Sequence, residues 1–244
     1  MKRACVIIPA RFNSSRFPGK PLVKLNGKEM ILWVAEICAK AVDISNVFVA
    51  TDDNRISDLV SEKGFQSIMT SPNLLTGTDR VAQAAKNLDY EIFVNVQGDE
   101  PLIEPKDILK AIELKIKNPE SVINSFCSIT KNEDPNSINI PKVTITESSD
   151  LIYISRAAIP KSKNNDEDLI YKKQVCIYSY NSKDLAKFLS FGRKSFTEEI
   201  EDIEILRFFE LNINIKMFEA SKSSLAIDVP KDVEKVEKAL KEID

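Results

Sequence analysis

The chain has 244 residues, 43% of them hydrophobic and 29% charged, values typical of one large or two small globular α/β domains. Its net charge of −3 gives no sign of nucleic acid or an anionic membrane as a partner, and no apolar stretch is long enough to span a membrane. The lack of histidine excludes His-containing zinc sites and Ser-His-Asp triads, and four scattered cysteines without a CxxC pair predict buried thiols in a reducing cytoplasm.

The first half of the chain alternates short apolar runs with segments of helical periodicity. Strands are predicted at residues 4–10, 46–51, 66–70 and 91–97, and helices at residues 28–42, 54–64, 78–88 and 107–117. This alternation indicates right-handed βαβ units and a parallel sheet. Ligands bind beyond the carboxyl ends of such strands, so we expect three segments to converge on one crevice: residues 11–22, 71–77 and 98–101.

The second half predicts a return to the same sheet. Residues 121–129 form a further apolar strand, and residues 142–147 and 151–155 alternate as a hairpin or sheet insertion. After a polar loop, predicted elements are a strand at 174–180, two helices, a strand at 214–219 and a helix that starts with Pro230. No repeat or linker divides the chain. We therefore predict one α/β domain over residues 1–244, with a Rossmann-like, mostly parallel sheet and helices on both faces.

The segment RFNSSRFPGKPL, residues 11–22, follows the first buried strand and is rich in cations. Arg11, Arg16 and Lys20 lie there with Ser14 and Ser15. Such a loop can wrap a polyphosphate, because arginine forks onto phosphate oxygens and lysine supplies a point charge. It is not a Walker A motif. An exposed surface loop is the simpler alternative for any basic segment.

Four motifs occur in a fixed order along the chain. They are IPAR-x4-RFPGKPL from Ile8, GTDR from Gly77, VNVQGDEPLI from Val94 and SRAAIP from Ser155. In this order they resemble the CMP-Kdo synthetases, cytidylyltransferases that activate 3-deoxy-manno-octulosonate (Kdo), and the resemblance covers almost the whole chain. It implies a nucleotidyltransferase fold, a Mg²⁺-dependent reaction of CTP with a 2-keto-3-deoxy sugar acid, and a homodimer. It also implies a small β insertion at about residues 130–180 for dimerisation or sugar binding.

The resemblance assigns roles to individual residues of this chain. The implied catalytic residues are Arg11, Lys20 and Asp99. The implied nucleotide-binding residues are Pro9, Ala10, Arg11, Ser14, Lys20, Ser71, Thr78, Arg80 and Gln97. The implied sugar-binding residues are Arg80, Gln97, Arg156, Gln174, Tyr178, Glu204 and Arg207. The implied Mg²⁺ ligands are Asp99 and Asp228, the latter in AIDVPKDV, which resembles the family segment Val-Asp-Thr-Pro-Glu-Asp.

This assignment agrees with the chemistry of the residues. Attack of a sugar hydroxyl on the α-phosphate has a largely electrostatic barrier, which positioned cations and a metal lower. Two aspartates from different halves of the chain suit Mg²⁺, which takes further ligands from phosphate and water. Each also has a simpler alternative role, since Asp99 and Asp228 both precede predicted helices and would act as N-caps.

Two positions depart from the family pattern on the sugar side. The chain has QVCIYSY where the family usually has HIGIYAY, so Gln174 replaces a histidine, and IEILR where it usually has LEQLR, so Ile205 replaces a glutamine. Unpaired sugar hydroxyls would cost ~1–3 kcal/mol each if buried. We therefore hypothesise that the CTP chemistry is retained and that the acceptor sugar is altered, to a Kdo variant or another ulosonic acid. Ordinary drift among true Kdo enzymes is the alternative.

The same region predicts which side chains face the cleft. Glu204 and Arg207 are three residues apart, and on one continuous helix both would point into the cleft. The acidic residues Glu198, Glu199 and Glu201 are expected on the solvated side of that helix. No chemistry is predicted for Cys5 or Cys176.

Two other functions compete with a sugar-acid cytidylyltransferase. A nucleotidyltransferase for a sugar 1-phosphate would usually begin with a GGxGxR loop, which this chain lacks. An inactive sugar-nucleotide-binding protein would not need Arg11, Lys20, Asp99 and Asp228 together. We expect a cytoplasmic enzyme of cell-surface polysaccharide synthesis, such as that of lipopolysaccharide or capsule.

Overall fold

The computed structural model describes residues 2–14, 16–131, 133–164, 169–222 and 224–242. Its strands are β1 (Lys2–Ala10), β2 (Lys24–Leu25), β3 (Lys28–Glu29), β4 (Val47–Thr51), β5 (Gln66–Met69), β6 (Tyr90–Val96), β7 (Val122–Ser128), β8 (Lys142–Ile145), β9 (Leu151–Ser155), β10 (Lys172–Tyr180) and β11 (Ile215–Glu219). Its α-helices are α1 (Met30–Ala41), α2 (Asn54–Glu62), α3 (Gly77–Ala85), α4 (Pro105–Lys117), α5 (Ser182–Ser190), α6 (Phe196–Glu201), α7 (Arg207–Glu210) and α8 (Val233–Lys241). Short 3₁₀ helices are η1 (Lys20–Leu22), η2 (Ile44–Asn46), η3 (Glu204–Leu206) and η4 (Pro230–Asp232).

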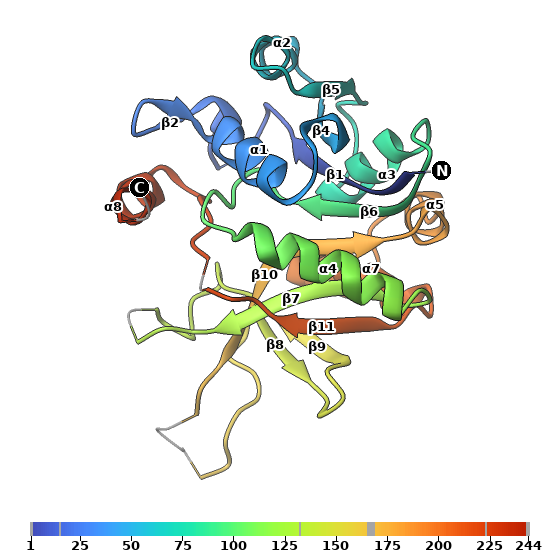
Figure 1. Ribbon diagram of the computed structural model, residues 1–244. Helices are drawn as coiled ribbons and strands as arrows, with labels where there is room; N and C mark the ends of the chain where they lie inside the picture. Colours follow the sequence, from blue (N-terminus) through green and yellow to red (C-terminus); the bar gives the residue numbers. More distant parts are fainter. Residues whose placement is uncertain (1, 15, 132, 165–168, 223, 243–244) are drawn as a thin grey trace.

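The central sheet has the strand order β11-β7-β10-β6-β1-β4-β5, and β8 joins it through β10 and pairs with β9 (Figure 1). β1 pairs in parallel with β4 and β6, as do β4 with β5 and β7 with β11. β10 is antiparallel to both of its long neighbours, β6 and β7. The predicted mostly parallel sheet is confirmed. β10 can reverse direction because the chain reaches it from a hairpin and a loop, without a crossover helix.

Helices cover both faces of this sheet (Figure 1), as predicted. Alternate residues of β1 face opposite layers. Cys5 and Ile7 pack with α3, α5 and α7, whereas Val6 and Ile8 pack with α1, α2 and α4. A strand buried on both faces needs apolar residues at every position, which explains the continuous run in the sequence.

The last helix, α8, lies beside α1 and β2, away from the sheet (Figure 1). Its Val236 and Leu240 are buried in a separate cluster with Leu25, Met30 and Ile227. The helix predicted at residues 28–42 starts only at Met30, because Asn26 (φ 49°) and Gly27 (φ 86°) turn the chain into the β2–β3 hairpin. Left-handed Asn-Gly is the strongest short signal for such a turn, and the sequence analysis overlooked it. No helix in the described ranges has the length and apolar character needed to cross a membrane.

Candidate active site

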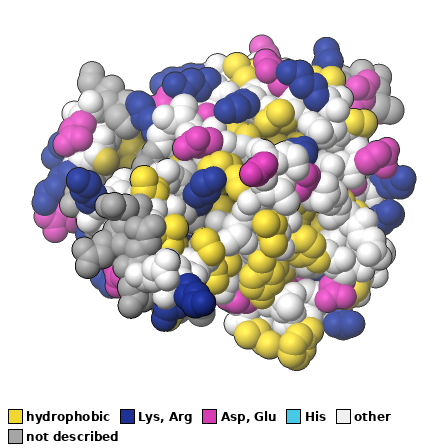
Figure 2. All heavy atoms as spheres, turned by 90° about the horizontal axis from the view of Figure 1, so that it is seen from below, with side chains coloured by type: hydrophobic (Ala, Val, Ile, Leu, Met, Phe, Trp, Pro, Cys, Tyr) yellow, Lys and Arg dark blue, Asp and Glu magenta, His cyan; other side chains and the backbone are white. Residues whose placement is uncertain are grey.

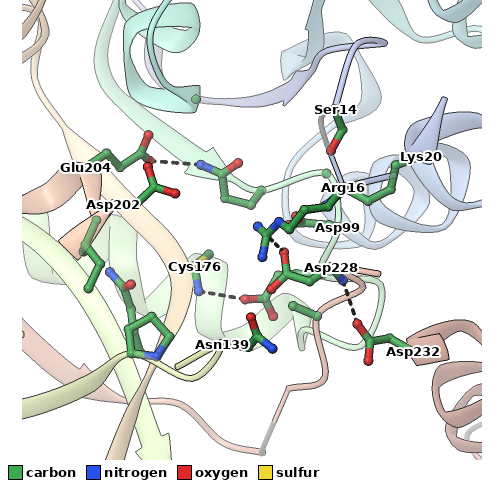
Figure 3. A pocket seen from close by; sticks show the side chains of 18 of the residues that line it. Ser14, Arg16, Lys20, Asp99, Asn139, Cys176, Asp202, Glu204, Asp228 and Asp232 are labelled. Atoms are coloured by element: carbon green, nitrogen blue, oxygen red, sulfur yellow. Dashed lines mark hydrogen bonds and ion pairs between the residues drawn. The ribbon is translucent and has the colours of Figure 1, made fainter. Parts of the chain in front are cut away.

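A cavity of about 660 Å³ opens at the carboxyl ends of β1 and β6 (Figure 3). Its wall includes residues from the loops after β1, β5 and β6, from β10, and from the segment leading into α8. The predicted convergence of these loops is confirmed. The predicted site residues that line the cavity are Pro9, Ala10, Arg11, Ser14, Lys20, Arg80, Gln97, Asp99, Arg156, Gln174, Tyr178, Glu204 and Asp228.

The loop after β1 is fixed by contacts near both of its ends. Phe12 N donates to Asp52 Oδ1 at 3.1 Å, and Gly19 N donates to Phe12 O at 2.9 Å. Gly19 has a left-handed φ of 72°, and a Cβ there would lie 3.3 Å from the Phe12 ring. Glycine therefore allows the close turn after which η1 presents Lys20 to the cavity.

Two aspartates that line the cavity, Asp99 near Lys20 and Asp228 near Arg16, are each paired with a cation (Figure 3). Lys20 Nζ lies 2.5 Å from Asp99 Oδ2 and 2.8 Å from Ile227 O. Arg16 Nη2 lies 3.0 Å from Asp228 Oδ1. Burial raises the pKa of Asp228, and the Asp99 carboxylate raises it further. The two carboxylates are therefore close enough to repel each other.

These two carboxylates fit a magnesium ion. Their oxygens are donors that Mg²⁺ prefers, and a bound cation would relieve the repulsion that raises the pKa of Asp228. No cluster of three or more His, Cys, Asp or Glu in the described residues is arranged to hold a metal. The remaining ligands would thus have to come from phosphate oxygens and water, as is usual for Mg²⁺.

A buried hydrogen-bond network lies at the other end of the cavity, where Figure 3 shows Asp202 and Glu204. Glu204 Oε2 accepts from Thr78 N at 3.0 Å, and Glu204 Oε1 accepts from Thr78 Oγ1 at 2.9 Å and from Gln97 Nε2 at 3.0 Å. Burial raises the pKa of Glu204, and no ion pair reaches this carboxyl from the described residues. This end therefore presents neutral donors around an uncompensated carboxyl group.

Gly77, the first residue of α3, leaves room for this network. A Cβ at this position would lie 2.6 Å from Gln97 Nε2 and 3.0 Å from Gln97 Oε1. Any larger residue would displace the amide from Glu204. The glycine of the GTDR motif is therefore needed for the shape of the site, independently of its backbone angles.

β10 contributes Gln174, Cys176 and Tyr178 to the cavity wall. Gln174 Nε2 donates to Asn124 Oδ1 at 3.0 Å and to Tyr178 OH at 3.2 Å. The amide hydrogens of Gln174 are thus engaged within the protein. The Gln174 carbonyl oxygen is the atom left to meet a ligand from this side chain.

Arg156 lies at the rim of the cavity and binds backbone carbonyls. Its Nε, Nη1 and Nη2 donate to Glu201 O at 2.5 Å, Ile138 O at 2.6 Å and Asp202 O at 2.9 Å. The guanidinium therefore ties residues 138 and 201–202 to the segment after β9. Sugar binding by Arg156 stays a prediction.

Comparison with known proteins identifies the family. The family model described as cytidylyltransferase matches residues 5–239. The chain belongs to this family. It is 39% identical to a 3-deoxy-manno-octulosonate cytidylyltransferase of Trichlorobacter lovleyi, over 97% of this chain and 98% of the relative. It is 36% identical to an 8-amino-3,8-dideoxy-manno-octulosonate cytidylyltransferase of Shewanella baltica, over 96% of this chain and 97% of the relative.

A solved structure of this cytidylyltransferase family has the same fold. The CMP:2-keto-3-deoxy-manno-octonic acid synthetase complexed with CTP superposes with a TM-score of 0.90 at 34% identity, and the match covers 100% of both chains. The resemblance on which the sequence analysis relied is therefore confirmed, as is the nucleotidyltransferase fold.

Three predicted residues of this cytidylyltransferase do not line the cavity: Ser71, Thr78 and Arg207. Ser71 N donates to Gln83 Oε1 at 2.8 Å, which holds the loop before α3. Thr78 is fully buried, and its backbone N and hydroxyl both donate hydrogen bonds to the Glu204 carboxylate. These two residues shape the cavity from outside its wall.

The prediction that Arg207 faces the cleft is wrong. Its side chain has no exposed surface and forms ion pairs with Asp79 at 2.8 Å and Glu198 at 2.6 Å. The helix expected through this region ends at Glu201, because Asp202 takes a left-handed φ of 49°. Glu204 and Arg207 therefore lie on different elements, η3 and α7, and Glu198 is a buried partner of Arg207 instead of a solvated residue.

Ile205 also lies away from the cavity, packed in the core with 1% of its surface exposed. It therefore does not leave a sugar hydroxyl unpaired. Gln174, the other of the two positions noted above, does line the cavity. Conversely, Glu100, Cys176, Lys231 and Lys235 are among the lining residues that the sequence analysis did not assign to the site. A signal existed only for the two lysines, which lie four residues apart at the start of the last helix.

Proposed function

We propose that this chain transfers CMP from CTP to a Kdo-like 3-deoxy-2-ulosonic acid and releases diphosphate. The observation that supports this most directly is one cavity with two different ends. Cations and two aspartates gather at one end, around Lys20 and Asp99, and neutral donors gather around Glu204 at the other. Relatives that match along almost the whole chain carry cytidylyltransferase names.

In the proposed reaction, the anomeric hydroxyl oxygen of the sugar acid bonds to the α-phosphorus of CTP. The bond from that phosphorus to the α,β-bridging oxygen breaks, and diphosphate leaves with the electron pair while the hydroxyl proton is released. Arg11 and Lys20 bind phosphate oxygens and stabilise the charge that develops on them. Asp99 and Asp228 would hold Mg²⁺, which when bound neutralises phosphate charge.

Two sugar acids are candidates for the acceptor of the CMP group, namely Kdo and its 8-amino derivative. Relatives of nearly equal identity are named for Kdo and for its 8-amino derivative. The cavity wall carries the neutral Gln174 and the uncompensated, buried Glu204. A carboxyl group without a cation partner accepts either a hydroxyl or an ammonium group, so both acceptors fit the sugar end.

The test is to incubate the purified protein with CTP, MgCl₂ and either Kdo or 8-amino-3,8-dideoxy-manno-octulosonate, and to measure diphosphate release. We expect turnover with at least one of the two acids. Asp99→Asn should lower that turnover by about 10²-fold or more while the circular dichroism spectrum stays the same. Turnover with a sugar 1-phosphate alone, or with no sugar acid at all, would contradict the proposal.

We further propose that the chain acts as a homodimer. Figure 2, which views the molecule from the side of β8 and β9, shows hydrophobic side chains gathered across this face. Phe196 and Ile200 lie one turn apart on α6 and are 74% and 68% exposed, and Ile152 on β9 is 57% exposed. Large apolar side chains at this exposure are uncommon on monomers, and a second copy of the chain would cover them.

We place the reaction in the cytoplasm, as a step toward cell-surface polysaccharide. All four cysteines are free thiols, which suits a reducing compartment. The activated sugar acid would serve as the donor for a later glycosyl transfer.

A further inference from the structure

The position of α8 is fixed by contacts on one side of the helix. Val236 and Leu240 are buried against Leu25. Glu237 accepts a hydrogen bond from Asn26 N at 2.8 Å through its side chain, and another from Asn26 Nδ2 at 3.0 Å through its carbonyl. These contacts hold the start of α8 at the nucleotide end of the cavity, where Figure 3 shows Asp228 and Asp232.

Two lysines from this segment line the cavity without partners. Lys231 and Lys235 are exposed, both contribute to the cavity wall, and neither forms an ion pair or a side-chain hydrogen bond with the described residues. Asp232 lines the cavity beside them, but its Oδ2 accepts from Asp228 N and Val229 N, both at 3.0 Å, and not from either lysine. Two lysines beside one carboxylate leave a net positive charge. The ammonium groups are therefore available to an anion in the cavity.

The charge balance of the nucleotide end calls for such cations. Lys20 and Arg16 are already matched by Asp99 and Asp228, so these four side chains together carry no net charge. Arg11 is the further cation that the first loop gives to the cavity wall. A nucleoside triphosphate carries several negative charges, most of them on its β- and γ-phosphates. One arginine and a bound divalent cation still leave part of that charge unbalanced.

We propose that Lys231 and Lys235 form a subsite for the β- and γ-phosphates of the nucleotide, and hence for the diphosphate that leaves. This inference rests on the proposed function. Lysine acts here as a point charge that accepts several phosphate geometries, which suits a group that changes from bound ester to free diphosphate.

The subsite predicts that removal of both lysines changes the affinity for ligands with β- and γ-phosphates but not the affinity for ligands without them. Removing both lysines weakens binding of any ligand that contains the β- and γ-phosphates. It leaves CMP, which ends at the α-phosphate, unaffected. Lys238 on the same helix provides a matched control, because it pairs with Glu234 at 2.7 Å and does not line the cavity.

Isothermal titration calorimetry with CMP, CTP and inorganic diphosphate, each with MgCl₂, tests the subsite. We expect the double variant Lys231→Ala/Lys235→Ala to bind CTP and diphosphate about tenfold more weakly, and CMP within about twofold of the starting protein. Lys238→Ala should bind all three unchanged. Lys231→Gln/Lys235→Gln should reproduce the loss although a polar, uncharged side chain remains at each position.

Two results would overturn the subsite: unchanged affinity for diphosphate in the double variant, or an equal loss for CMP and CTP. Failure of the unsubstituted protein to bind CTP would instead overturn the proposed function itself. The two failures are therefore distinguishable in one set of titrations.

Discussion

At the scale of single residues, adjacent side chains in this site have opposite surroundings. Both line the cavity, but Asp99 pairs with Lys20, whereas Glu100 is only 3% exposed and its carboxylate is bonded within the protein. Glu100 Oε1 accepts from Cys176 N at 3.0 Å, and its other oxygen accepts from the Ser224 hydroxyl. Burial raises the pKa of Glu100, and Asp99 adds to that effect. The Asp99 carboxylate is thus available to a ligand in the cavity. The Glu100 carboxylate instead links β10 to the segment before α8 through its hydrogen bonds.

Arg207 is expected to matter for stability, because removing it would leave Asp79 and Glu198 buried without their cation. Arg207→Met should lower the free energy of unfolding by about 3–5 kcal/mol, measured by urea denaturation. Arg193→Met, at an exposed residue, serves as the control. A loss below about 1 kcal/mol would show that the buried ion pairs do not hold this region together.

Glu204 predicts a pH dependence of stability. Its raised pKa means that the folded protein binds this proton more tightly than the unfolded chain does. Its contribution is therefore full below the ordinary value of 4.5 and is lost as the pH rises through the raised value. Glu204→Gln cannot titrate, so its free energy of unfolding should fall less between those two values than that of the unsubstituted protein. Parallel curves in urea denaturation across a pH series would contradict this assignment.

At the scale of elements, short turns and helix ends decide which side chains reach the cavity. The left-handed residue Asp202 ends α6 and allows η3 to turn Glu204 inward. Gly77 starts α3 at the place where the Gln97 amide passes. Neither effect appears in a pattern of hydrophobic residues. The first depends on the backbone angles of one residue, and the second on a strand end that is distant in the sequence.

Gly77→Ala should disturb the sugar end without unfolding the protein. The added Cβ would meet only the flexible end of Gln97, which can move away at the cost of its hydrogen bond to Glu204. We expect the KM for the acceptor to rise about tenfold, which corresponds to about 1.4 kcal/mol. In a Gln97→Ala background the same substitution should have no further effect on KM. An additional tenfold rise in that background would mean that Gly77 acts through something other than Gln97.

At the scale of the whole molecule, two apolar layers enclose the sheet, and a third small cluster fixes α8. The loop after β1 and the segment before α8 line one end of the cavity, and η3 and β10 line the other. The exposed apolar residues of α6, Phe196 and Ile200, do not line the cavity. This separation means that assembly and nucleotide binding can be tested independently.

The double variant Phe196→Glu/Ile200→Glu should convert a dimer into a monomer, because two charges would be buried in an apolar interface. Light scattering after size-exclusion chromatography measures the change in mass. Met69→Glu, at a residue of β5 that is 51% exposed, is the control and should leave the mass unchanged. A monomeric unsubstituted protein, or a double variant that stays dimeric, would contradict the proposed interface.

Most strands and helices, the mostly parallel sheet and the edge at which the loops converge were predictable from the sequence, although the β2–β3 hairpin and the break after α6 were missed. These predictions were possible because buried strands need apolar residues at each position and parallel strands share their carboxyl edge. Only the tertiary structure decided that Glu204 faces the cavity while Arg207 and Ile205 do not, and that Lys231 and Lys235 reach it. The physical reason is that a single left-handed residue redirects a helix, and that contacts between residues far apart in the chain leave no local pattern.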